Sequence, residues 1–192
     1  MTASMGYAAP RKVLCENSTA TWCPYCPNVG QAIGMLMDKF GDQLIPFQMH
    51  QSDSYSNSWG NSRMSFYGVG PIPDVRIDGV FSQIGSYGNA NADANNIGNL
   101  IQNRLNNPTD VTLNLCASDS GNDHSIEIQV AIESNGTGRT MRVHCVQTLD
   151  GYPSGAQYFN TAIIGPAYST VTLAPGEQTS VVMNFTLTGA SA

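Results

Sequence analysis

The chain has 192 residues, of which 41% are hydrophobic and only 11% are charged. Its formal net charge of −6 and isoelectric point near 4.7 argue against a nucleic-acid-binding protein, because such proteins need a basic surface. The Lys and Arg residues are scattered, and no apolar run approaches the roughly 20 residues that span a bilayer. We therefore expect no nucleic-acid partner and no membrane span.

The first ten residues, Met1–Pro10, contain no apolar stretch of the kind found in secretory leaders. A secreted protein made without its leader has the same appearance. The hydrophobic content is sufficient for one large or two small cores.

Up to residue 107, short apolar runs alternate with segments of helical periodicity, which is typical of an α/β domain. Val29, Ile33, Leu36 and Phe40 recur at helical spacing, and Gly41 follows as a helix stop. The remaining polar stretches read as loops. The expected strands are 11–15, 44–49, 74–78 and 80–84, and the expected helices are 24–40, 63–67 and 91–105.

After Pro108 the hydrophobic period changes to two, which predicts strands. Apolar residues alternate with polar ones most clearly from Ile126 to Ile132, and again near 111–115, 141–145, 171–173 and 181–187. Turn residues separate these runs at short intervals, as in a small sandwich. We therefore divide the chain into an α/β domain over 11–107 and a β-sandwich domain over 108–192.

The stretch Trp22-Cys23-Pro24-Tyr25-Cys26-Pro27 places two cysteines three positions apart at the junction between the first strand and the first helix. A thiolate at a helix N-terminus meets unpaired N–H groups and the positive end of the helix dipole, so we expect Cys23 to have a lowered pKa. Cys23 is the expected nucleophile, and Cys26, deeper in the helix, the expected resolving thiol. Pro24 suits the first helical turn because its missing N–H has no partner there.

Other interpretations of the cysteine pair stay open. The pair is an inert disulfide if the domain serves only as a binding scaffold. A metal site would require further ligands such as His50, and no four-ligand set is evident, so we expect no metal.

The order strand, dithiol, helix, strand, proline turn, hairpin and helix resembles that of the thioredoxin superfamily. The matching residues are Trp22–Cys26 and the segment Gly70-Pro71-Ile72-Pro73, followed by a strand and Gly79. The resemblance implies that Pro73 is cis and lies beside the dithiol. Ile72 and Pro73 would then form a platform for an extended substrate strand, with Trp22 as an apolar contact.

A narrower resemblance is to an outer-membrane-protein family of bacteria in which a thioredoxin-like domain precedes a β-sandwich. It is carried by Val13–Glu16, Thr19–Cys23, Tyr67–Val69, Tyr158–Asn160 and Leu173–Glu177. This resemblance implies an extracytoplasmic protein: periplasmic, outer-membrane-associated or secreted, with its leader absent from this chain. It also implies one further strand beyond Ala192, so either the chain lacks that strand or the sheet edge stays open.

One position departs from the thioredoxin pattern. Related enzymes often carry a buried acid six positions before the first cysteine, and here that position is Asn17, which cannot exchange a proton. Glu16 is adjacent, but the period of a strand turns it to the opposite face. His50 is an alternative base, although a surface histidine in a loop is the commoner case.

The other three cysteines lie outside the dithiol. Cys15 is expected to behave as a small buried hydrophobe. Cys116 and Cys145 invite a disulfide across the sandwich, but strand parity places them on opposite faces unless a bulge intervenes.

The sequence thus predicts an α/β thioredoxin-like domain followed by an all-β Ig-like sandwich. The expected function is that of a thiol–disulfide oxidoreductase acting through Cys23 and Cys26 on protein or peptide substrates. It would need no cofactor, but it would need a redox partner that recycles the dithiol. The alternative is a non-catalytic binding or surface-assembly protein on a thioredoxin-like scaffold.

Overall fold

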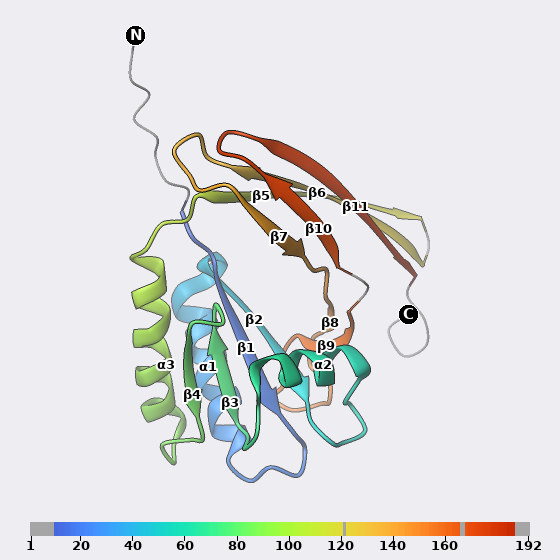
Figure 1. Cartoon of the computed structure of the whole chain (residues 1–192). Helices are drawn as coiled ribbons and strands as arrows, with labels where there is room; N and C mark the ends of the chain where they lie inside the picture. The colour runs from blue at the N-terminus through green and yellow to red at the C-terminus, as the bar shows by residue number, and fades with distance from the viewer. Residues whose placement is uncertain (1–9, 121, 166–167, 187–192) are drawn as a thin grey trace. The chain divides into compact units, whose positions relative to one another are not determined.

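The computed structural model describes residues 10–120, 122–165 and 168–186. The chain forms two compact units (Figure 1). The first unit contains Arg11–Asn107 together with Val146–Gly165, and the second contains Pro108–Cys145 and the described chain after residue 167. No helix in the described ranges is long and apolar enough to cross a bilayer.

The first unit is built on a six-stranded mixed sheet with the strand order β4-β3-β1-β2-β9-β8. β1 runs parallel to β2 and antiparallel to β3, and β3 pairs antiparallel with β4. These strands are β1 (Val13–Thr19), β2 (Leu44–His50), β3 (Asp74–Ile77), β4 (Phe81–Ile84), β8 (Gln147–Leu149) and β9 (Thr161–Ile164).

Three α-helices accompany this sheet: α1 (Cys26–Phe40), α2 (Ser58–Tyr67) and α3 (Ala90–Leu105), with a short 3-10 turn, η1 (Gly41–Gln43). Each follows from local sequence. Pro27 occupies the first turn of α1, and the side chains of Asn57 and Asn89 cap α2 and α3. α1 therefore begins two residues later than expected, Pro24 precedes it, and α2 is longer than expected because Asn57 starts it. A mixed sheet with three helices in this order is consistent with a thioredoxin-like domain.

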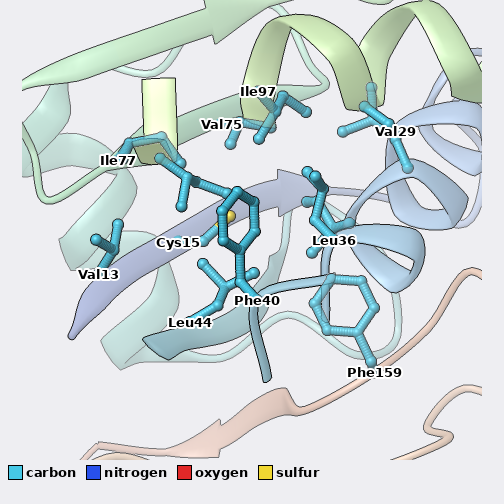
Figure 2. Close-up of a cluster of buried hydrophobic side chains, with 14 residues drawn as sticks. Val13, Cys15, Val29, Leu36, Phe40, Leu44, Val75, Ile77, Ile97 and Phe159 are labelled. Atoms are coloured by element: carbon cyan, nitrogen blue, oxygen red, sulfur yellow. The ribbon is translucent and has the colours of Figure 1, made fainter. Parts of the chain in front are cut away.

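The helices divide between the two faces of the sheet, and the period of β1 shows how. Val13 and Cys15 face α1 and α3, where Figure 2 shows them in the main apolar cluster with Val29, Leu36 and Ile97. The alternate residue Leu14 belongs to a second cluster under α2, formed chiefly by Phe47, Met49, Trp59, Met64 and Ala162. The same alternation determines which side chains of β1 lie near the cysteine pair.

Residues 146–165 differ from the expected domain division, because β8 and β9 join the sheet of the first unit beside β2. Asn160 and Gln157 explain the attachment. The Asn160 side chain donates to the carbonyl of Pro46, and Gln48 donates to the carbonyl of Gln157. Phe159 completes the main apolar cluster. The segment is short and rich in turns, so its sequence shows little hydrophobic periodicity from which the attachment could be predicted.

The described residues of the second unit form two antiparallel sheets, one with the order β11-β6-β5 and the other pairing β10 with β7. Ile128, Val130 and Ile132 of β6 form a common apolar cluster with Val143, Val171, Leu173 and Met183. The expected alternation is thus confirmed on β6, whereas the Ig-like sandwich class stays a prediction. The strands are β5 (Val111–Ser120), β6 (Asp123–Ile132), β7 (Arg139–Val143), β10 (Ser169–Leu173) and β11 (Gln178–Thr186). β11 is described as far as Thr186, and residue 187 of the strand expected over 181–187 lies outside the described residues.

Candidate functional site

The two cysteines of the predicted dithiol lie between β1 and the first turn of α1, and they form a disulfide. Cys23 is in the connecting loop and Cys26 is the first residue of the helix, with their Cα atoms 5.5 Å apart. Both are buried, with exposed fractions of 4% and 3%. Burial alone therefore does not distinguish the two sulfurs in the disulfide form.

The surrounding main chain does distinguish them. The backbone N–H of Cys26 donates to Sγ of Cys23 across 3.1 Å, and the N–H of Cys23 donates to the carbonyl of Ala20. An N–H at the first turn of a helix has no intrahelical acceptor, so it is available to a sulfur at that end. Any negative charge on Cys23 would be stabilised by this N–H and by the helix dipole.

The Ile72–Pro73 peptide bond is cis, and the structure brings it next to the disulfide. The carbonyl oxygen of Ile72 lies 3.8 Å from Sγ of Cys23, and Ile72 packs against the small cluster formed by Ala20, Cys23 and Cys26. Two segments well separated in sequence thus meet at Sγ of Cys23. A peptide laid along Ile72 would pass close to that sulfur.

Two aromatic side chains flank the cysteines at the surface. Trp22 is 58% exposed and its indole N–H donates to the carbonyl of Ser52 across 3.2 Å. Tyr25 is 60% exposed and was not singled out from the sequence. Its position between the two cysteines is the feature of the sequence that could have identified it as a site residue. Exposed aromatics of this kind offer apolar contact area to a bound chain.

Asp53 holds the loop that carries Trp22. Its carboxylate accepts from the N–H of Thr21 and the N–H of Tyr55, and it lies 2.7 Å from Nδ1 of His50. Burial would raise the pKa of the Asp53 carboxyl, but the hydrogen bonds from His50, Thr21 and Tyr55 outweigh it and hold the pKa below its ordinary value. Sequence reasoning missed Asp53, because it sits in a polar stretch that reads as a loop.

Three polar side chains lie buried near the carboxyl ends of β1 and β2. Asn17 and Gln48 are fully buried, and His50 is 1% exposed, so the expectation of a surface histidine is wrong. β2 ends at His50 rather than before it, which places the ring inside the fold. Rings of Tyr55 and Tyr158 pack against it at centroid distances of 5.4 and 5.5 Å.

Glu16 lies on the opposite face of β1 from Asn17, as strand parity predicted. It is fully buried, and its carboxylate accepts from Arg63 and from the hydroxyl of Tyr67, both on α2. Burial, together with the hydrogen bond to Glu16, raises the pKa of the Tyr67 hydroxyl well above its usual range. Glu16 is therefore engaged in structure and does not face the cysteine pair.

The other cysteines are free thiols. Cys15 is buried in the main cluster, and burial raises the pKa of its thiol well above the ordinary value. Cys116 is exposed and pairs in register with Glu127, whereas Cys145 packs against the cluster of the second unit. Cys116 and Cys145, whose pairing the sequence left open, do not form a disulfide. Within the described residues, no group of His, Cys, Asp and Glu gathers into a metal site.

The comparisons with known proteins bear on the fold alone. No protein-family model matches the chain, and no curated protein matches it. A structural-genomics protein from Agrobacterium tumefaciens is 18% identical over 93% of this chain and 80% of its own, with a TM-score of 0.55. The germline-specific thioredoxin Deadhead from Drosophila melanogaster is 17% identical over 48% of this chain and 80% of its own, with a TM-score of 0.35. The first of these supports a shared fold over both units. The site itself is a Cys-x-x-Cys disulfide at the start of α1, beside the cis peptide bond of Ile72–Pro73.

Proposed function

We propose that the protein is a thiol–disulfide oxidoreductase. The observation that carries the proposal is the hydrogen bond from the first amide of α1 to Sγ of Cys23, in a disulfide whose second sulfur belongs to that same helix. A sulfur so placed is a good leaving group and, when reduced, a reactive thiolate at neutral pH.

In the reducing direction, the Cys23 thiolate attacks a substrate disulfide and forms a mixed disulfide, releasing one substrate thiolate. Cys26 then loses its proton, attacks Cys23, and releases the second substrate thiolate. Two electrons pass from the protein dithiol to the substrate. In the oxidising direction the same steps run backwards.

The substrates we propose are protein or peptide thiols and disulfides. The carbonyl of Ile72 next to Cys23, with Trp22 and Tyr25 exposed beside it, suits an extended chain that pairs with the backbone and packs on aromatic rings. A separate redox partner would restore the dithiol or disulfide after each turnover. An extracytoplasmic location fits such chemistry and rests on the family resemblance.

Insulin reduction in the presence of dithiothreitol tests the proposal. The wild-type chain should accelerate the reaction, Cys23→Ser should abolish the acceleration, and Cys26→Ser should trap a mixed disulfide at Cys23. Cys145→Ser, which removes a thiol of the second unit, is the matched control and should behave as the wild type. Equal activity of Cys23→Ser and wild type would contradict the proposal and favour a binding protein on this scaffold.

A further inference from the structure

Among the described residues, four buried polar atoms on the face of β1 and β2 that α1 covers have no hydrogen-bond partner. They are both side-chain atoms of Asn17, Oε1 of Gln48 and Nε2 of His50. Buried polar groups are almost always paired, with protein or with ordered water, because an unmade hydrogen bond costs about 1–3 kcal/mol. Such a concentration of unpaired atoms therefore calls for an explanation at this site.

The register of the sheet brings these atoms together. Asn17 pairs with Gln48 and Thr19 pairs with His50 across the parallel β1–β2 ladder. Asn17 lies two residues beyond Cys15, so it shares the face that α1 covers. β1 and β2 are parallel and α1 connects them, so α1 runs back from the carboxyl end of β1 to the start of β2. Its first residue, Cys26, therefore begins at the carboxyl ends of these strands, where the unpaired atoms are.

Asp53 fixes the state of the His50 ring. The Asp53 carboxylate lies 2.7 Å from Nδ1, which places the proton of the neutral ring on Nδ1 and leaves Nε2 as an acceptor. Besides Asp53, the titratable side chains that pack against His50 are those of Tyr55 and Tyr158. Glu16, the buried acid on β1, is on the far face and bound to Arg63.

We propose that His50 is the proton acceptor for the resolving thiol, through water held by Asn17 and Gln48. The inference rests on the proposed function. When Cys26 attacks the mixed disulfide, its thiol proton passes through this water to Nε2 of His50, and Asp53 stabilises the imidazolium. The Cys26–Cys23 bond forms as the bond from Cys23 to substrate breaks, and the imidazolium later returns the proton to the departing thiolate or to solvent. His50 thereby replaces the acid missing at Asn17.

Dithiodipyridine separates the two steps, because attack by Cys23 releases one thiopyridone and attack by Cys26 releases the second. The protein should carry Cys116→Ser and Cys145→Ser, so that only the dithiol and the buried Cys15 remain. We expect His50→Asn, which keeps the hydrogen bond to Asp53, to slow the second release about a hundredfold and leave the first unchanged. The pH profile of the second release should also lose the inflection caused by protonation of the histidine. His144→Asn, in the second unit, is the matched control and should change neither.

A second measurement uses the unaltered side chains. Nitrogen NMR of the reduced and oxidised wild-type protein should show His50 with its proton on Nδ1. A proton on Nε2, or a second release unaffected by a folded His50→Asn, would overturn the inference while leaving the oxidoreductase proposal intact. Failure of the proposed function looks different: the wild type would then not accelerate insulin reduction at all.

Discussion

The backbone N–H of Cys26 points at Sγ of Cys23 across 3.1 Å, so the first amide of α1 is committed to a sulfur and not to a carbonyl. This contact makes the two sulfurs unequal. Sγ of Cys23 accepts a hydrogen bond from the N-terminus of α1, whereas Cys26 is itself a residue of that helix.

We predict that Cys23 in the reduced protein has a pKa below the ordinary thiol value of about 8.5, because the helix terminus favours the thiolate. Thiolate absorbance measures it as a function of pH in Cys26→Ser, which keeps the amide, combined with Cys116→Ser and Cys145→Ser so that only Cys23 and the buried Cys15 remain. The same variant unfolded in urea is the control and should return to the ordinary value. Equal values in the folded and unfolded protein would contradict the prediction.

Trp22→Ala should raise the KM for a protein disulfide about tenfold, equivalent to the loss of about 1.4 kcal/mol of binding. The exposed indole contributes contact area to a substrate but little to the core, so the free energy of unfolding should change by less than about 0.5 kcal/mol. Phe66→Ala, which removes a 71% exposed aromatic on α2, is the control. A similar loss in both variants would show that exposure alone, and not position beside Cys23, matters.

Gly30→Ala should destabilise the first unit. A Cβ at Gly30 would overlap the carbonyl oxygen of Gln157 and lie 2.9 Å from its Cβ, so the loop before β9 must move. We expect a loss of about 1–3 kcal/mol, typical of overpacking. Gly34→Ala, one turn later with nothing within 4 Å of the added atom, should instead stabilise α1 by about 0.5–1 kcal/mol. Urea unfolding of the two variants makes the comparison, and destabilisation of both would contradict it.

Glu16→Gln should reduce stability without slowing thiol exchange. The substitution leaves the guanidinium of Arg63 without its carboxylate, and because Arg63 is 23% exposed we expect a loss of about 2–3 kcal/mol, less than for a fully buried pair. The thiopyridone release rates of the folded variant should match the wild type. A selective slowing of the second release would identify Glu16 as the base in place of His50.

Acid should destabilise the protein partly through Asp53. Its folded pKa is lowered from 3.8, so the stabilisation is complete above about pH 4 and is lost as the pH falls through the folded value. Asp53→Asn should therefore cost about 1–2 kcal/mol at neutral pH and flatten the fall in stability below pH 4. Urea unfolding at a series of pH values tests this, and an unchanged acid slope would contradict it.

Much of the first unit could be predicted because its signals are local. The periodicity from Val29 to Phe40 indicated α1, and the spacing of Cys23 and Cys26 before it indicated the site. Parity along β1 correctly separated Glu16 from Asn17. Each of these inferences needs only the geometry of one strand or one helix.

What could not be predicted depends on contacts across the chain. His50 seemed to be a surface residue because nothing near it in sequence shows that Tyr158 covers its ring. Asp53 seemed to be a loop residue because its partner Thr21 lies in another segment. Residues 146–165 belong to the first unit because side chains such as Phe159 pack into a core whose other residues lie far earlier in the chain.

That last attachment has a consequence for how the protein is made. The first unit is interrupted in sequence by β5, β6 and β7, so its sheet remains incomplete while those strands are being synthesised. Until β9 emerges from the ribosome, β2 has a free edge, the core lacks Phe159, and Tyr158 does not shield His50. Domains usually fold in order from the N-terminus during synthesis. Here the main apolar cluster and the surroundings of His50 are completed only after β5, β6 and β7 have been translated.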